Sequence, residues 1–135
     1  MNSIILWENS EFAVSTPKNP HIPYSEGLHL VVAPKVDVPN AWENVELASK
    51  AFKLASQVCK ILSNLGMAPW FNLQANGNWG LLEGNTPFFH IHVYGRNKTL
   101  TWGKPLVLPE APGTYSNYPM PDTDQLKIKT ALEIL

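Results

Sequence analysis

The segment from Asn40 to Gly66 constrains the fold of this chain more than any other. Asn40 is an N-cap residue followed three places later by Glu43, which is the spacing of a capping box. Gly66 supplies a left-handed C-terminal cap. We therefore expect an amphipathic helix of about 25 residues with one buried face. Its apolar positions recur mostly at spacings of three and four: Leu47, Ala51, Phe52, Leu54, Ala55, Val58, Ile61, Leu62 and Leu65.

Short β-prone runs surround this helix and supply the layer on which it can pack. Runs at 4–7 and 12–15, separated by polar residues, predict a hairpin, and the run at 28–33 predicts a buried strand that ends at Pro34. Further strands are predicted at 69–74 and 87–94, with a turn at 75–80 rich in residues that accept a positive φ. The order of strands, helix, strands and helix favours an α+β fold with an antiparallel sheet.

The C-terminal part is rich in proline up to its last helix. The segment at about 101–121 holds five prolines and allows at most one short strand, at 106–108. Asp122 can cap a helix that runs to the end of the chain. Its apolar stripe is predicted to be Leu126, Ala131, Leu132 and Leu135. A chain of 135 residues suffices for one domain with a core, so we expect a single domain over 1–135.

The composition excludes several classes of partner. The net charge is −1 and the charged fraction is 16%, below the roughly 25% of an average soluble protein, so we expect neither a nucleic acid polymer nor a membrane surface as partner. No apolar stretch approaches the roughly 18 residues that span a bilayer, and the N-terminus lacks the basic start of a signal peptide. The single cysteine, Cys59, cannot form an internal disulfide. We expect a cytoplasmic protein.

The predicted strand ending near Arg96 has two faces of opposite character. Side chains alternate along a strand, so Phe89, Ile91 and Val93 share an apolar face that should pack on the long helix. The other face presents Phe88, His90, His92 and Tyr94. Its two imidazoles stand about 6–7 Å apart.

Two neighbouring imidazoles permit several kinds of chemistry. An imidazole has an unperturbed pKa near 6.5, so it can attack phosphorus, donate a proton or ligate a metal at cellular pH. A zinc site would need a third ligand, which His29 could provide. A purely structural, hydrogen-bonded role is the remaining alternative. The sequence contains no G-x-x-x-x-G-K, G-x-G-x-x-G or Cys-x-x-Cys, which argues against P-loop, Rossmann and structural-zinc classes.

The histidine segment resembles the end of the histidine triad (HIT) signature, in which alternating histidines and apolar residues precede a turn to arginine. The stretches 19–23 and 27–35 resemble the loop and the following strand of that family. Counting back from Arg96, the resemblance makes His92 the third histidine and His90 the second, which is the family's nucleophile. Phe88 then replaces the first. The other alignment, with His90 first and His92 as nucleophile, would misplace the arginine.

The resemblance implies a hydrolase that cleaves at the α-phosphate of a nucleotide through a nucleotidyl-histidine. The catalytic residues would be His90, His92 and His29, the last matching the family's fourth histidine, with no metal and no cofactor. The free nitrogen of His90 would attack while its other nitrogen donates to a backbone carbonyl. A nucleotide or dinucleotide substrate and a homodimer are the implied partners. The implied nucleotide-binding residues are Phe12, Ile22 and Leu30 in an apolar slot and Asn76 and Asn85 near the phosphate.

Two other functions stay open from the sequence. The phenylalanine at position 88 could have abolished catalysis, in which case the chain would be a diverged nucleotide-binding module. A metal enzyme that uses His90, His92 and His29 is the second alternative.

Overall fold

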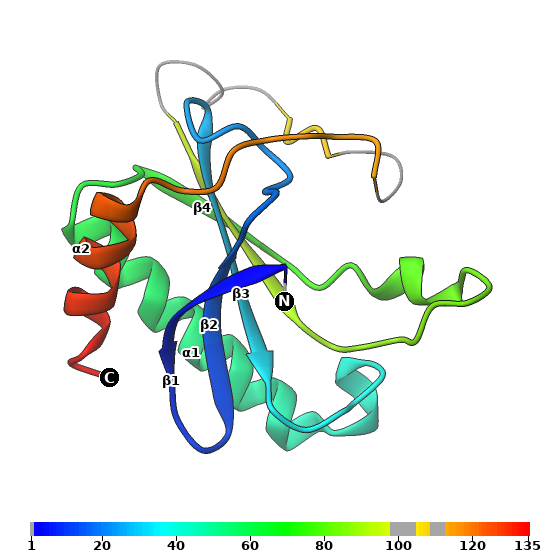
Figure 1. The fold of residues 1–135 in the computed structure, drawn as a ribbon. Helices are drawn as coiled ribbons and strands as arrows, with labels where there is room; N and C mark the ends of the chain where they lie inside the picture. The colour runs from blue at the N-terminus through cyan, green and yellow to red at the C-terminus, as the bar shows by residue number, and fades with distance from the viewer. Residues whose placement is uncertain (1, 98–104, 109–112) are drawn as a thin grey trace.

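The computed structural model describes residues 2–97, 105–108 and 113–135. Five strands form one antiparallel sheet in the order β1-β2-β3-β5-β4, and the long helix α1 and the C-terminal helix α2 accompany it (Figure 1). The α+β prediction is confirmed, as is the N-terminal hairpin. The strands are β1 (Ser3–Glu8), β2 (Phe12–Pro17), β3 (Gly27–Pro34), β4 (Trp70–Gln74) and β5 (Ile91–Arg96). The helices are η1 (Ala41–Glu43), α1 (Val45–Asn64), η2 (Gly77–Leu81) and α2 (Asp122–Leu132).

The start of the long helix differs from the prediction, whereas its end agrees. Asn40 caps the short 3-10 helix η1, because its Oδ1 accepts from the Glu43 N–H at 3.1 Å. A second asparagine, Asn44, caps α1, which is 20 residues long rather than about 25. Two capping asparagines four residues apart therefore divide the predicted helix. At the other end Gly66 adopts a φ of 72°, as predicted for a left-handed cap.

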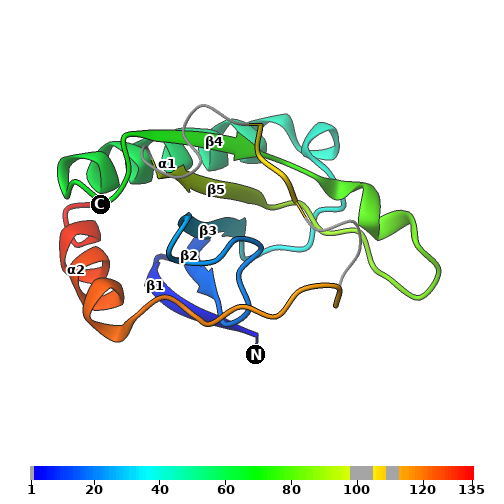
Figure 2. The same ribbon diagram turned by 90° about the horizontal axis from the view of Figure 1, so that it is seen from above.

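The core lies between α1 and the sheet. The strand residues Leu30, Ile91 and Val93 are fully buried, as are the helix residues Ala51 and Val58. The buried stripe of α1 is narrower than predicted, since Phe52 and Leu65 remain partly exposed. In Figure 2, α1 and the segment that leads into α2 lie on opposite sides of the sheet. Loops rather than a helix therefore cover the sheet face opposite α1.

Helix α2 is oriented differently from its predicted stripe. It buries Gln125, Ile128 and Leu132, whereas the predicted Leu126 is 64% exposed. Its N-cap position is Pro121, so Asp122 lies inside the first turn instead of capping it. The Tyr24 hydroxyl donates to Asp124, and this bond ties the loop between β2 and β3 to the helix. Packing against β1 and α1 thus overrides the weak apolar pattern of this helix.

Two local predictions are wrong. Strand β5 begins at Ile91 rather than at Pro87, because the Phe89 N–H donates to the Val38 carbonyl in the loop after β3 and not to a neighbouring strand. The stretch 75–80 contains no positive φ and instead leads into the 3-10 helix η2. Residues 105–108 form no strand, which agrees with the prediction of at most one short strand in this segment. The rest of the proline-rich segment, at 101–104 and 109–112, lies outside the described residues.

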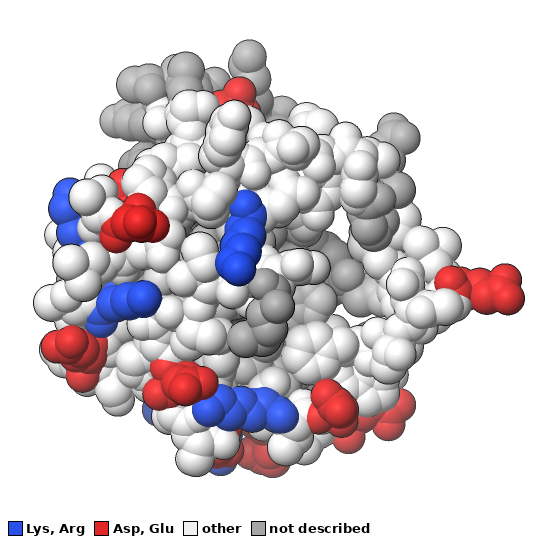
Figure 3. All heavy atoms as spheres, in the orientation of Figure 1, with Lys and Arg blue, Asp and Glu red and all other residues white. Residues whose placement is uncertain are grey.

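Acidic and basic side chains are interspersed over the face in Figure 3, as the small net charge predicts. Within the described part of the chain, no helix combines the length and the apolar character needed to cross a bilayer.

Candidate active site

Four histidines meet on the sheet face opposite α1. His29 comes from β3 and His92 from the neighbouring β5, whereas His90 lies just before β5 and His21 in the loop between β2 and β3. The Nε2 of His29 lies 2.9 Å from the Nδ1 of His92. The Nε2 of His92 in turn lies 3.0 Å from the Nε2 of His90. The three histidines chosen from the sequence are thus joined in one hydrogen-bonded row, which we call the histidine relay (His29, His92, His90).

The backbone at each end of the relay fixes where its protons lie. At one end the His21 N–H donates to the Nδ1 of His29 at 3.0 Å, so the proton of a neutral His29 must sit on Nε2. It donates to His92, whose own proton therefore sits on Nε2 and faces His90. At the other end the Nδ1 of His90 lies 2.8 Å from the Phe88 carbonyl, which can only accept. One proton arrangement satisfies both ends, and it leaves a lone pair on the Nε2 of His90.

Burial keeps the inner part of the relay neutral. Removal from water, together with the smaller effect of the neighbouring imidazoles, lowers the pKa of His29 to about 2 and the pKa of His92 to about 3. The pKa of His21 is also lowered by burial and by His90. His29 and His92 are 3% and 7% exposed, and their hydrogen bonds replace the lost water. Both imidazoles therefore carry a single proton at cellular pH.

His21 is a site residue to which the sequence analysis assigned no role. Its ring packs on His29 at 4.3 Å between centroids and on His92 at 5.0 Å. Its Nδ1 lies 2.7 Å from the hydroxyl of Tyr94, the residue opposite His29 in the sheet. No periodic pattern could have revealed it, because it belongs to a proline-rich loop whose path depends on distant contacts.

One such contact comes from the segment before α2. Asn117 donates to the Pro20 carbonyl and to the Asn19 side chain, each at 2.7 Å, and Asn19 donates to the Tyr115 carbonyl at 3.1 Å. The ring of Tyr115 meets His21 edge-on at 5.2 Å. This segment therefore holds the His21 loop in place over the relay.

Phe88, at the predicted position of the first triad histidine, lies beside the relay. Its ring stacks on His90 with the centroids 5.6 Å apart, and it is 37% exposed. The contact orients the imidazole but offers no proton and no hydrogen bond. The carbonyl of the same residue accepts from His90, so residue 88 positions His90 through both its backbone and its side chain.

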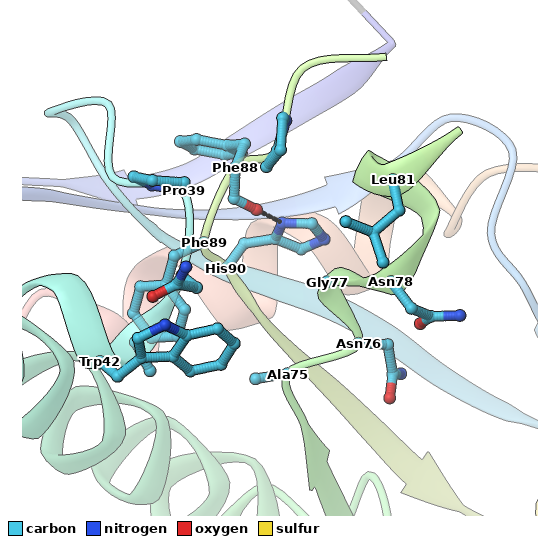
Figure 4. Close-up of a pocket in the computed structure, with 13 residues that line it drawn as sticks. Pro39, Trp42, Ala75, Asn76, Gly77, Asn78, Leu81, Phe88, Phe89 and His90 are labelled. Carbon is cyan, nitrogen blue, oxygen red and sulfur yellow. Dashed lines mark hydrogen bonds between the residues drawn. The ribbon is translucent and has the colours of Figure 1, made fainter. Parts of the chain in front are cut away.

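A cavity of about 500 Å³ opens next to His90 (Figure 4). One wall comes from η1 and the loop before it, and the other from η2 and the residues on either side. Asn76 lines this cavity, as a ligand-contacting residue would. Asn85 does not line it and instead donates to the Trp79 carbonyl at 3.1 Å. We call this space the His90 cavity.

The apolar residues assigned to a nucleoside slot lie elsewhere. Phe12 and Leu30 are 4% and 0% exposed and belong to the hydrophobic core. Ile22 is 8% exposed and lines only a small space of about 10 Å³ beside His29. None of the three lines the His90 cavity. Trp42, which the sequence analysis did not single out, lines it and is 77% exposed.

A metal site would draw on a different trio from the one considered in the sequence. Among the described residues, His21, His29 and His92 offer ring nitrogens that all lie within 4.8 Å of one another. Three imidazoles are a ligand set that zinc accepts. However, a neutral His29 that binds metal through Nε2 must carry its proton on Nδ1, where the His21 N–H already donates. The hydrogen bonding of the relay thus favours protons over a metal at this point.

Comparison with known proteins identifies the fold. No family model matches the chain, and no curated protein matches its sequence. Solved structures do match: a histidine triad protein from Bradyrhizobium japonicum has a TM-score of 0.69 at 18% identity, over 98% of this chain and 90% of that one. A zinc-bound histidine triad family protein from Mycobacterium smegmatis also has a TM-score of 0.69, at 14% identity, over 99% of this chain and 86% of its own. A HIT family hydrolase from Clostridium thermocellum has a TM-score of 0.54 at 24% identity, over 80% and 88% of the two chains. The fold is therefore that of histidine triad proteins.

Proposed function

We propose that the chain is a hydrolase that cleaves nucleotide phosphoanhydrides or phosphoramidates at the α-phosphate, with His90 as the nucleophile. The observation that carries this proposal is the bond between the Nδ1 of His90 and the Phe88 carbonyl at 2.8 Å. It commits the ring proton to Nδ1 and places the lone pair on Nε2, which accepts from the His92 N–H until it attacks phosphorus. The fold shared with a HIT family hydrolase also supports it.

The reaction would proceed in two displacements at phosphorus. The Nε2 of His90 forms a bond to the α-phosphorus while the P–O or P–N bond to the leaving group breaks, and the leaving group keeps the electron pair. A phosphate departs as the anion, whereas an amine takes up a proton from solvent water as it leaves. Water then attacks the same phosphorus, the electron pair of the P–N bond returns to the Nε2 of His90, and the proton that the water loses passes to solvent. The products are the released leaving group, a nucleoside monophosphate and free His90.

His92 and His29 would act as donors rather than as acids. The Nε2 of His92 lies 3.0 Å from the Nε2 of His90. Once the Nε2 of His90 bonds to phosphorus it no longer accepts this hydrogen bond, so the His92 N–H can donate to a phosphate oxygen instead. His29 holds His92 in that tautomer through its own N–H. Because both imidazoles are neutral, neither has a proton to spare. Leaving groups that depart as stable anions, as phosphates do, fit this arrangement best.

Replacement of His90 tests the proposal most directly. His90→Ala should lower cleavage of a dinucleoside polyphosphate or an adenosine phosphoramidate by about 10³-fold or more, because the variant lacks the nucleophile. Nucleotide binding should survive, which calorimetry can measure. His92→Ala should slow the reaction less. Cleavage that persists in His90→Ala but vanishes in His92→Ala would instead make His92 the nucleophile.

The alternative function is a nucleotide-binding module that has lost catalysis. It is favoured by the phenylalanine at position 88, where the resemblance to histidine triad proteins places the first histidine. Micromolar nucleotide binding by the wild type, without turnover above the His90→Ala background, would establish the module. Phe88→His helps to distinguish the hydrolase from the binding module, because it restores a histidine at the position of the family's first triad histidine. We expect this variant to match or exceed the wild-type rate, with Phe88→Leu as the control that changes the ring without adding a donor.

We also propose that the chain acts as a cytoplasmic homodimer. Strand β4 lies at one edge of the sheet and carries Trp70, which is 62% exposed. An exposed edge strand with an exposed tryptophan is a surface that a second copy could cover. Light scattering at micromolar concentration should report about twice 15.1 kDa. A 15 kDa particle throughout the accessible concentration range would refute the dimer.

A further inference from the structure

We propose that the His90 cavity binds a neutral heteroaromatic ring of the substrate, either its nucleobase or an aromatic part of its leaving group. The inference rests on the proposed function, because His90 forms part of the cavity wall. A ring seated there would be attached to the phosphorus that His90 attacks. The proposal thus specifies which part of the substrate the enzyme recognises beside its nucleophile.

The lining selects against charge. Its members are apolar or amide-bearing, and apart from His90 no titratable side chain belongs to the described lining. A phosphate chain would enter such a space without a cation to pair with it, at a large desolvation cost. A volume of about 500 Å³ is within the range of small-molecule sites and exceeds what one planar ring system needs.

Trp42 supplies a platform on which a ring can stack. It is 77% exposed, although tryptophan is a side chain that proteins usually cover. Its position is fixed by η1, which Asn40 caps on one side and which Asn44 joins to α1 on the other. Figure 4 shows Trp42 and Leu81 on opposite sides of the cavity, with His90 between them. Leu81 is 84% exposed, so both walls present apolar surface that a ring would cover.

The amides at the cavity edge fit a heteroaromatic ring better than a plain hydrocarbon. Asn76 and Asn78 both line the cavity, and Figure 4 places them on the η2 side. The amide nitrogen of Asn76 donates to Gln74 at 2.9 Å, which orients its side chain. An amide has both donors and an acceptor, as the edge of a nucleobase does.

The η2 wall is attached closely to the segment that positions His90. A Cβ on Gly80 would lie 2.7 Å from the Cα of Pro87, so only glycine permits this approach. Pro87 begins the extended stretch that ends at His90, and the Phe89 N–H anchors that stretch to Val38. A ring against η2 would therefore sit at a fixed distance from the nucleophile.

Substitution of Trp42 in the full-length chain tests the proposal, with Tyr118→Ala as the matched control because Tyr118 is also an exposed aromatic residue but lies outside the cavity. Calorimetry compares the affinity for adenosine 5′-monophosphate with that for ribose 5-phosphate, which lacks the base. If the nucleobase is the occupant, Trp42→Ala weakens binding of the monophosphate by about tenfold and leaves ribose 5-phosphate unchanged. Tyr118→Ala should change neither affinity.

A second arm examines the leaving group. If its ring is the occupant, Trp42→Ala leaves binding of the monophosphate unchanged and instead raises the KM for adenosine phosphoranilidate, but not for the methylamine analogue. Unchanged affinities and unchanged KM values in Trp42→Ala would overturn the proposal. So would a Trp42→Ala variant whose only difference from the wild type is dissociation of the dimer into monomers. The affinity arm needs no turnover. An inactive wild type that loses base-dependent binding in Trp42→Ala would therefore keep the cavity assignment and refute the hydrolase.

Discussion

The two faces of β5 are buried to a similar degree but are stabilised by different interactions. Ile91 and Val93 are fully buried against α1 and the rest of the core. On the other face His92 is 7% exposed and Tyr94 is fully buried, but their neighbours are histidine rings and hydrogen-bond partners. Apolar packing stabilises the first face at any pH. The second face is stable only while its imidazoles stay neutral and bonded, so stability and chemistry are separated across a single strand.

The largest expected effect comes from breaking the apolar face. Ile91→Ala removes buried methyl groups from a position with no exposed surface, so we expect a loss of about 2–5 kcal/mol in the free energy of unfolding. Urea unfolding followed by circular dichroism measures it. Ile91→Val, the control, should cost only about 0.5–1.5 kcal/mol. A loss below 1 kcal/mol for Ile91→Ala would contradict the assignment of this face to the core.

The alternation along β5 is also the part of the molecule that the sequence predicted best. A strand has a period of two, so the placement of His90 and His92 opposite Ile91 follows from their order alone. The bond from His90 to a backbone carbonyl was likewise expected from the family resemblance, and the Phe88 carbonyl accepts it. Local periodicity and capping chemistry therefore predicted the strands, the end of α1 and the shared face of His90 and His92, whereas the place of His29 beside them was expected from the family resemblance.

The sequence did not predict what depends on loops. His21 reaches His29 because Asn19 and Asn117, far apart in the chain, hold its loop in place. Trp42 lines the cavity because a second capping asparagine, Asn44, ends the first turn and starts α1. Neither arrangement depends on a repeat or a residue spacing that can be recognised in the sequence. The nucleoside slot was placed on core residues for the same reason, since apolar side chains of the core and of a pocket look alike in sequence.

A lower pH should destabilise the histidine face of β5 but not its apolar face. The expected loss of stability is intermediate in size. In the unfolded chain a histidine gains its proton near pH 6.5, whereas in the folded protein the pKa of His29 is about 2 and that of His92 about 3. The unfolded state therefore binds more protons, and stability falls as the pH drops below 6.5 toward 3. For these two histidines together we expect a loss of about 1.4 kcal/mol between pH 7 and pH 6.

Urea unfolding at both pH values measures this loss, in a range where carboxylates scarcely titrate. His92→Gln should reduce the loss between pH 7 and pH 6 by about 0.7 kcal/mol, which is the contribution of one buried imidazole. Equal stability of the wild type at pH 7 and pH 6 would show that the relay binds protons in the folded state. In that case the fixed proton arrangement, and the neutral donor role of His92, would have to be abandoned.

The smallest expected effect concerns zinc, for which the histidine face offers three nitrogens but the wrong arrangement of protons. The His21 N–H occupies the Nδ1 lone pair of His29, so a metal on Nε2 would force two N–H groups against each other or require an imidazolate. We therefore expect far less than one zinc per chain in protein purified without a histidine tag, and little change in unfolding on addition of a chelator. Elemental analysis measures the first and urea unfolding the second. A zinc-bound protein from Mycobacterium smegmatis has the same fold, so the zinc content of this chain is a meaningful test. One zinc per chain that disappears in His92→Ala would mean that the histidine face is a metal centre, and the nucleophilic role of His90 would then lose its basis.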